Sequence, residues 1–350
     1  MRARTALSVT ATTLAAALML SGCVAGEGSA SADDAPAGGA TTAGEWSADV
    51  LNVDFATYNP LSLVIKEQGW LEETLGDDVT VNWIQSAGSN KANELLRAGA
   101  VDVGSTAGSA ALLAKANGSP ITTIDIYSQP EWSAIVVPAD SDITDVSQLA
   151  GKSIAATKGT DPYFFLLQTL EEAGVPLDQV EVQNLQHADG RTALESGSVD
   201  AWSGLDPMMA ATEAAAGSKL IYRNIDFNTY GFLNATDSFL EKSPDLAQLV
   251  VDAYEKARAW AQENPDETVA ILAEVAGIEP AIAEKVLLER TNLAVDPAPG
   301  EKQRKVLEIV GPIFVESGDV ASQAAIDTAL ETLLDPSFVN AADPSAVTGD

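Results

Sequence analysis

Short apolar runs alternate with longer amphipathic segments over residues 50–222 of the chain. Val50–Ala56 and Val79–Gln85 have the period-two pattern of strands, whereas residues 61–76 and 90–99 carry apolar side chains at three- and four-residue spacing. Further strands are expected at 101–105, 121–128, 133–138, 152–157, 180–185, 199–203 and 219–223, and helices at 109–118, 161–174, 189–197 and 206–217. This alternation predicts an α/β fold with parallel sheets flanked by helices.

The alternation falls into two series, separated by the polar stretch Ala139–Gln148, and it gives way to helices alone after residue 236. Two α/β lobes are therefore expected, with the C-terminal helices, through about Leu334, packed on the first lobe. Two passages of the chain between the lobes, near Ser133–Pro138 and Tyr230–Asn234, would form a two-strand hinge. The predicted boundaries are 48–137 and 231–335 for the first lobe, 138–230 for the second lobe and 336–350 for a frayed tail.

The N-terminus has the pattern of an export signal. Residues 1–22 combine a basic start with an apolar segment too short for a comfortable membrane span, and Cys23, the only cysteine, follows directly. Residues 23–47 are rich in Gly, Ala, Ser and Thr, which indicates a flexible tether. Without a second cysteine, no disulfide can form within the chain.

The chain is strongly acidic. Its 19 basic and 51 acidic residues give a formal charge of −32, and removal of residues 1–22 would take away Arg2 and Arg4 but no acid. Such a surface argues against binding to nucleic acid and to anionic lipid. It does not restrict a small ligand, whose site depends on local groups.

Small polar residues stand where predicted strands lead into helices. In open parallel sheets, ligands bind beyond the carboxyl ends of the strands, where helix N-termini offer free N–H groups and a positive dipole end. Such a place suits an oxyanion, since glycine lets it approach the backbone and hydroxyl groups add donors. The candidates are Ser86, Gly88, Ser89 and Asn90 in the first turn, Ser105, Thr106, Ala107 and Gly108 in the second, and Lys158, Gly159, Thr160 and Asp161 in the third.

Aromatic side chains near the same strand ends are candidates for the rest of a ligand pocket. Tyr58 follows the first strand, Trp132 lies beside a predicted passage between the lobes, and Trp202 ends a strand of the second lobe. Trp202 suits the core equally well. Asp206 could cap the next helix or meet an amine on a ligand, and capping is the simpler role.

Segments such as "LRAGAVDVGSTAGSAALLAKANG" and "LESGSVDAWSGLDPMMAATEAAAG" resemble ABC-transporter solute-binding proteins, in particular the aliphatic sulfonate/taurine/nitrate group. The resemblance covers about residues 50–264. It implies a type II periplasmic-binding-protein fold, in which a ligand is clamped between two lobes and delivered to an ABC permease. It also implies a small anionic ligand, no cofactor, a monomer, oxyanion contacts from the first two turns, and second-lobe contacts from the third turn and near Trp202. "LSGC", ending at Cys23, resembles a lipobox, which implies a lipid anchor at this cysteine on the outer face of the cytoplasmic membrane.

The ligand stays open at this point. The sulfonate-binding branch usually has Gly-Pro where this chain has Gly88-Ser89, and often "WDP" where it has Leu205-Asp206-Pro207. A neighbouring branch with the same fold recognises pyrimidine precursors of a vitamin. A ligand sensor that feeds no transporter is a further alternative.

An enzyme is the less favoured alternative. Gly104–Gly108 imitates a nucleophile elbow with Thr106 as nucleophile, but the chain has one histidine, His187, which is expected in a loop or a pocket of the other lobe. "LAGKS" imitates the end of a phosphate-binding loop, with Val146 where that motif needs its first glycine. No cluster of metal ligands is evident.

Overall fold

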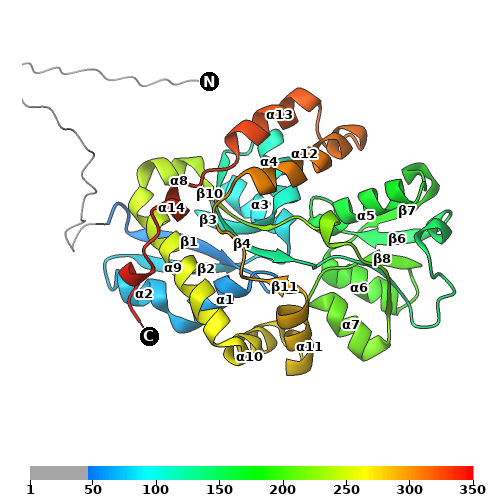
Figure 1. Ribbon diagram of the computed structural model, residues 1–350, viewed down its shortest axis with the longest axis horizontal. Coiled ribbons are helices and arrows are strands. Elements are labelled where there is room, and N and C mark those ends of the chain that lie inside the picture. The colour runs from blue at the N-terminus through cyan, green and yellow to red at the C-terminus, as the bar shows by residue number, and fades with distance from the viewer. Residues whose placement is uncertain (1–45, 350) are drawn as a thin grey trace, which may run out of the picture. The chain divides into compact units, whose positions relative to one another are not determined.

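The computed structural model describes residues 46–349, so the signal peptide, Cys23 and nearly all of the predicted tether lie outside the described residues. The described part contains two sheets, each flanked by helices (Figure 1). The first sheet has the strand order β11-β4-β10-β3-β1-β2. Its strands are β1 (Val50–Phe55), β2 (Thr80–Gln85), β3 (Val103–Ala107), β4 (Ile121–Pro130), β10 (Gly231–Thr236) and β11 (Thr291–Asn292).

Three parallel strands of the first sheet end side by side. β1 pairs in parallel with β2 and with β3, so Phe55 lies beside Gln85 and Val53 beside Val103. β10 lies antiparallel between β3 and β4. Because the carboxyl ends of β1, β2 and β3 share one edge, the turns that follow them gather at one place.

The second sheet has the strand order β7-β6-β8-β5-β9. Its strands are β5 (Ile135–Val137), β6 (Ser153–Ala156), β7 (Glu181–Asn184), β8 (Ala201–Ser203) and β9 (Lys219–Tyr222). β5 was expected in the first lobe, but it pairs with β8 and β9 in the second sheet. The chain therefore passes between the sheets at 131–134 and again at 223–230. Both passages lie a few residues before their predicted places.

Helices α1 to α7 connect the strands much as the pattern predicted. They are α1 (Pro60–Gln68), α2 (Trp70–Leu75), α3 (Ser89–Ala98), α4 (Gly108–Ala116), α5 (Asp161–Glu172), α6 (His187–Glu195) and α7 (Met208–Ala216). The helix predicted at 61–76 is divided in two at Gly69, whose left-handed φ of 67° turns the chain while its N–H bonds to the carbonyl of Ile65.

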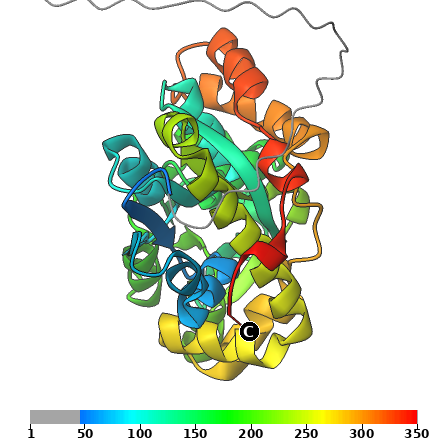
Figure 2. The same ribbon diagram turned by 90° about the vertical axis from the view of Figure 1, so that its left-hand side faces the viewer.

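The C-terminal helices form two groups on opposite sides of the first sheet (Figures 1 and 2). One group covers α1 and contains α9 (Pro244–Glu263), α10 (Pro265–Ala276) and α11 (Pro280–Glu284). The other covers α4 and contains α12 (Glu301–Glu316) and α13 (Gln323–Thr332). Both groups also touch the second lobe. Phe314 of α12 packs on Phe164 of α5 with the ring centres 4.2 Å apart.

The predicted frayed tail is wrong. Residues 337–340 form α14, and Val347 is buried in the apolar core of the first lobe. The ammonium group of Lys256 on α9 donates to the carbonyl oxygens of Val347 and Thr348. The buried side chain of Val347 and the ammonium group of Lys256 on α9 thus hold this segment in place, although its own sequence looks polar and irregular.

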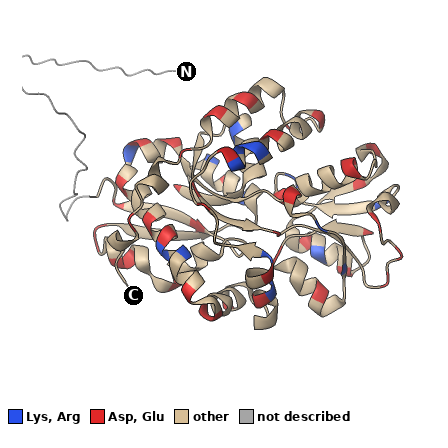
Figure 3. Cartoon of the chain, in the orientation of Figure 1, with Lys and Arg blue, Asp and Glu red and all other residues tan. Residues whose placement is uncertain are grey.

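Acidic side chains greatly outnumber basic ones over the visible faces of both lobes (Figure 3). Within residues 46–349, no helix has the length and apolar composition needed to cross a bilayer.

A buried ion pair joins the C-terminal helices to the second lobe. The Arg290 guanidinium, just after the π-helical turn Lys285–Glu289 that follows α11, lies 3.1 Å from the carboxylate of Asp206 and 2.6 Å from that of Glu213 on α7. Arg290 and Asp206 are each only 3% exposed. The loss of hydration by both charges offsets much of their attraction. The pair therefore fixes how these two segments are oriented more than it adds to the free energy of unfolding.

Removal of one partner of this pair should therefore cost more than removal of both. We expect Arg290→Met to lower the free energy of unfolding by about 3–5 kcal/mol, because it leaves Asp206 buried without its cation. Asp206→Asn in the same chain should recover most of that loss. Urea unfolding of the two single variants and the double variant measures this difference, and additive losses would contradict it.

Candidate functional site

The two lobes meet around a small cavity with a volume of about 10 Å³. Residues of all three predicted turns and two of the three predicted aromatics contribute to its wall. It is lined by Tyr58, Ser89, Ala107, Trp132, Thr160, Asp161, Pro162, His187 and Leu205. These nine lining residues include no lysine or arginine.

A buried carboxylate organises the floor beneath the first two turns. Asp54, at the end of β1, accepts hydrogen bonds from the Ser86 hydroxyl at 2.5 Å and from the N–H and hydroxyl of Ser105 at 2.9 and 3.0 Å. The ends of β1, β2 and β3 are thereby fixed to one another. The Ser86 and Ser105 hydroxyl groups point at Asp54, away from the cavity that they were expected to line.

The N-terminus of α3 keeps its donors free. No side chain among the described residues caps its first N–H groups. The Ser89 hydroxyl oxygen accepts from the Ala107 N–H at 2.9 Å, which leaves the hydroxyl proton available to a bound molecule. With the helix dipole behind it, this N-terminus is suited to an oxyanion.

The N-terminus of α4, in contrast, is used inside the protein. Gly108 donates its N–H to the carbonyl of Tyr230 at 2.9 Å, and Ser109 donates its N–H to the Thr229 hydroxyl at 3.1 Å. Gly108 meets a packing need, because a Cβ there would lie 2.8 Å from the Phe232 ring. The amides expected to hold an oxyanion at this turn are already bonded to the second passage between the lobes.

Thr106 lies in β3, beside Phe232 of the neighbouring strand β10. Its hydroxyl donates to the carbonyl of Ala107 and accepts from the side-chain amide of Asn234. Thr106 is fully buried and does not line the cavity, which leaves no exposed hydroxyl of the kind a nucleophile elbow presents.

Asp161, at the start of α5, is hydrogen-bonded to α4 and to both passages between the lobes. Its carboxylate accepts from the Ser109 hydroxyl of α4 at 2.5 Å and from the Trp132 indole N–H at 2.7 Å. It also accepts from the N–H and the hydroxyl of Thr229, both at 2.7 Å. Trp132 and Thr229 belong to the two passages between the lobes. Burial raises the pKa of Asp161, while these four donors act against the rise.

His187, at the start of α6, faces the first lobe across the cavity. Its Nδ1 lies 3.2 Å from the Thr157 hydroxyl, and its Nε2 has no hydrogen-bond partner among the described residues. A Cβ placed on Gly88 would come within 2.9 Å of Nε2, so this nitrogen points at the N-terminal turn of α3. Burial lowers the pKa of His187 to about 4, which keeps the ring neutral near pH 7.

Tyr58 and Trp132 separate this cavity from a second one. Their rings meet edge to face with the centres 6.1 Å apart. Both also line the neighbouring cavity, of about 10 Å³, together with Asp206 and Arg290. The Tyr58 hydroxyl donates to the carbonyl of Ser105, so the ring is fixed from behind.

The other residues that were expected to contact a ligand do not line this cavity. Trp202 is fully buried in the core of the second lobe. Lys158 is exposed and lies over the ring of Tyr163. Asn90 and Gly159 line an open hollow on the outside of the same interlobe contact.

Asp206 caps the first turn of α7 by accepting from the Ala210 N–H at 2.9 Å, which confirms the simpler of its two expected roles. Burial raises the pKa of Asp206 to about 6 even though Arg290 acts to lower it. Its carboxylate is thus occupied by an N–H group and a guanidinium of the protein itself.

The sequence analysis missed Asp54, Ser109 and Thr229. An aspartate inside an otherwise apolar strand is a usable signal for Asp54, because a buried carboxylate needs donors. Ser109 and Thr229 gave no such signal, since their partners lie 52 and 68 residues away along the chain, at Asp161. Within residues 46–349, no group of three or more His, Cys, Asp or Glu side chains is placed to hold a metal ion.

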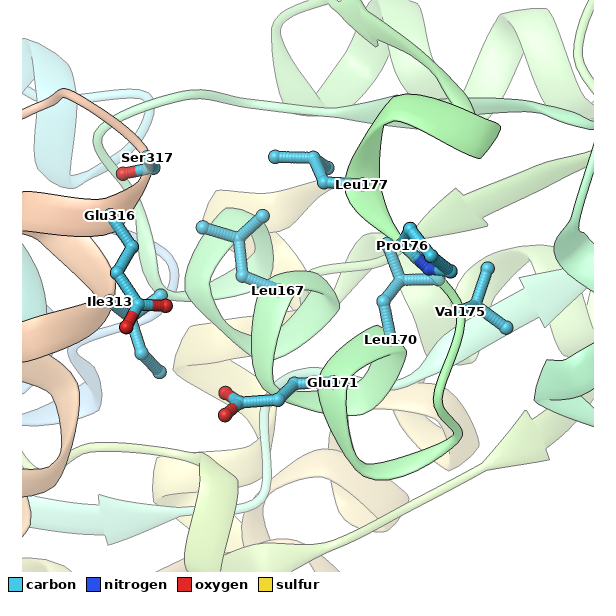
Figure 4. Close-up of a pocket in the computed structure, with 9 residues that line it drawn as sticks. All are labelled: Leu167, Leu170, Glu171, Val175, Pro176, Leu177, Ile313, Glu316 and Ser317. Carbon is cyan, nitrogen blue, oxygen red and sulfur yellow. The ribbon is translucent and has the colours of Figure 1, made fainter.

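A larger groove lies between α5 and α12 and is less suited to an anion. It has a volume of about 310 Å³ and is lined largely by leucine, isoleucine and valine side chains. The carboxylates of Glu171 and Glu316 extend into the space between the two helices (Figure 4).

Comparison with known proteins agrees with the geometry. A family described as NMT1/THI5 like matches residues 61–268, which is more than half of the chain. The chain belongs to this family. The putative aliphatic sulfonates-binding protein of Escherichia coli K12 is 26% identical over 74% of this chain and 82% of its own length. The Bacillus subtilis 168 protein of the same name is 29% identical over 64% of this chain and 69% of its own length.

Solved structures confirm the two-lobe fold class. The alkanesulfonate-binding protein SsuA of Xanthomonas axonopodis pv. citri, bound to MOPS, has a TM-score of 0.72 at 21% identity, over 81% of this chain and 98% of that chain. The desulfurization enzyme DSZB has a TM-score of 0.62 at 16% identity, over 84% of this chain and 98% of that chain. The fold is therefore shared by binding proteins and by an enzyme.

Titration of Asp54 should make stability depend on pH. Burial raises the pKa of Asp54 from 3.8 to about 7, so the folded state holds its proton more tightly than the unfolded state does. The stability of the wild type relative to Asp54→Asn should thus fall as pH rises from about 4 to 7, by roughly 4 kcal/mol, and level off above. Urea unfolding at several pH values measures it, with the exposed Asp77→Asn as control. A constant difference between wild type and Asp54→Asn would contradict the expectation.

Proposed function

We propose that this protein is the extracytoplasmic solute-binding component of an ABC importer, and that it captures a small sulfonate in the cavity between its lobes. The observation that carries the proposal is the uncapped N-terminus of α3, with the free Ser89 hydroxyl proton beside it, facing the cavity at the interlobe contact. The sulfonate oxygens would accept from the N–H groups of Ser89 and Asn90 and from the Ser89 hydroxyl. Thr160, Tyr58 and Trp132 would enclose the rest of the ligand.

Several observations favour binding over catalysis. Thr106 is buried in β3 beside β10, and His187 makes no hydrogen bond to a serine or threonine hydroxyl of the first lobe among the described residues. Both curated relatives are named as binding proteins. The DSZB structure shows that the fold itself does not decide this point, so the proposal rests on the site.

The proposed location follows from the same relatives and from the sequence. The Escherichia coli SsuA structure is titled a periplasmic aliphatic sulphonate binding protein. With the signal-like residues 1–22, this supports export of the present chain. We further propose that Cys23 carries a lipid anchor and that a monomer delivers the ligand to a membrane permease.

Ligand capture would involve relative motion of the lobes. Residues 131–134 and 223–230 are the passages between the sheets, and we propose that they serve as the hinge. The first lobe spans residues 48–130 and 231–349 in this proposal, and the second spans 135–222.

Sulfonate binding should stabilise the protein and should depend on Ser89. A ligand at one hundred times its Kd adds about 2.7 kcal/mol, which thermal unfolding with C2–C4 alkanesulfonates, nitrate and an aminopyrimidine would detect. Ser89→Ala removes one hydrogen bond to a charged group and should weaken sulfonate binding roughly ten- to a hundredfold.

Ser196→Ala is the matched control, since Ser196 is exposed at the end of α6, and it should bind as the wild type does. Stabilisation by the uncharged aminopyrimidine alone would reject an oxyanion ligand. Sulfonate turnover by the purified protein would reject a pure binding role.

A further inference from the structure

Two adjoining hollows between α5 and α12 form one groove, named here the α5–α12 groove. The first hollow, of about 310 Å³, and the second, of about 450 Å³, share Glu171, Ile313 and Glu316 in their walls. Helix α5 of the second lobe forms one wall, and α12 of the C-terminal helices forms the other (Figure 4). Phe227, in the passage 223–230 between the lobes, lines the second hollow. A molecule held between these walls would therefore contact both lobes.

The walls of the groove are largely apolar, and part of this apolar surface is open to solvent. Leu177 is 39% exposed and lines the first hollow, and Ile309 is 65% exposed and lines the second. Ile309 is the most exposed large apolar side chain among the described residues. Exposed apolar side chains that gather in a hollow are typical of a surface that binds a partner, whereas single ones scattered over a surface are not.

All the charged side chains that line the groove are carboxylates. They are Glu171 and Glu172 on α5 and Glu316 on α12, and no lysine or arginine lines either hollow. Glu172 accepts a hydrogen bond from the Tyr222 hydroxyl, whereas the side chains of Glu171 and Glu316 bond to no described residue. Two like charges that face the same space repel each other, and a cation between them replaces this repulsion with attraction.

The charge of the groove argues against an occupant from the chain itself. Residues 23–45, which lie outside the described part, contain four acidic residues and no lysine or arginine. A second copy of the protein carries the same formal charge of −32. Either of them would bring more negative charge to Glu171 and Glu316. A different molecule, with apolar and positively charged groups, fits this surface.

We propose that the α5–α12 groove binds an amphipathic, basic helix of a protein partner, and that this helix contacts both lobes at once. Its apolar side chains, at three- and four-residue spacing, would lie against Leu177, Ile309 and Ile313, with lysine or arginine near Glu171 and Glu316. The walls have suitable lengths, since α5 has 12 residues and α12 has 16. The inference does not rest on the proposed function, because the groove shares no lining residue with the interlobe cavity.

Binding of a designed peptide to charge variants tests the inference. The probe is a dye-labelled helix of about 14 residues, built from leucine and lysine at helical spacing. Its binding is measured by fluorescence anisotropy at about 0.15 M salt, which screens attraction beyond roughly 8 Å. The double variant Glu171→Gln/Glu316→Gln should bind the peptide about three- to tenfold more weakly than the wild type does.

The double variant Glu267→Gln/Glu274→Gln is the matched control. Both side chains are exposed on α10, so the formal charge changes equally, and the affinity for the peptide should stay as in the wild type. Equal weakening by the two double variants would show that the peptide responds to the charge of the whole protein, and it would overturn the inference.

A second pair of variants tests the apolar contact. Ile309→Ser should weaken binding of the peptide about fivefold or more, because it removes apolar surface that the peptide would cover. Leu288→Ser is the control, since Leu288 is 52% exposed and lines neither hollow, and it should bind as the wild type does. Unchanged binding to Ile309→Ser, or equally tight binding of a peptide with serine in place of leucine, would overturn the inference.

The two single charge variants show whether the helix contacts both lobes. Glu171 lies on the second lobe and Glu316 on α12, so Glu171→Gln and Glu316→Gln should each weaken binding of the peptide, by about two- to threefold. No effect from one of them would overturn the contact with both lobes. Neither residue lines the interlobe cavity, so sulfonate binding should be unchanged in both variants, and failure of the peptide test would leave the proposed function in place.

Discussion

The contact of the two lobes depends on the carboxylate of Asp161. It belongs to α5 of the second lobe, yet its donors come from α4 of the first lobe and from both passages between the lobes. A buried carboxylate is unfavourable unless donors replace its lost hydration, and here four of them do. Because these donors come from three separate parts of the chain, the charge is satisfied only when these parts come together. Asp161 therefore makes the arrangement of the cleft specific.

Hydrogen bonds within the protein thus determine which helix N-terminus still has free N–H groups for a ligand. The Ser109 hydroxyl is bonded to Asp161, and the α4 amides are bonded to Thr229 and Tyr230, so α4 contributes to closure. The N-terminus of α3 has no such partner, and the neutral ring of His187 faces it. Two similar turns at equivalent places in the sheet thus have different roles, one holding the lobes together and the other left open to a bound molecule.

Much of the fold follows from periodicity, whereas the roles within the site do not. The alternation of strands and helices was sufficient for two α/β lobes, since each element buries one face by its own pattern. β5 was misplaced because a short apolar strand pairs equally well with either sheet. Trp202 could not be assigned from sequence, as a tryptophan at a strand end suits a core and a pocket alike. The second turn was expected to be free because its partner, residues 229–230, lies about 120 residues farther along the chain.

Closure of the lobes does not rest on Asp161 alone. Phe164 and Phe314 share an apolar contact on one side of the molecule, and Arg290 is paired with Asp206 on the other. Contacts of this kind favour the closed arrangement whether or not a ligand is bound, and a ligand that must enter an open form binds more weakly by the fraction of molecules that are open. The ion pair limits this effect, because opening returns water to both charges and so offsets the attraction that is lost. A site that closes over its own carboxylate thus leaves few polar groups without a partner, and His187 Nε2 is one of them among the described residues.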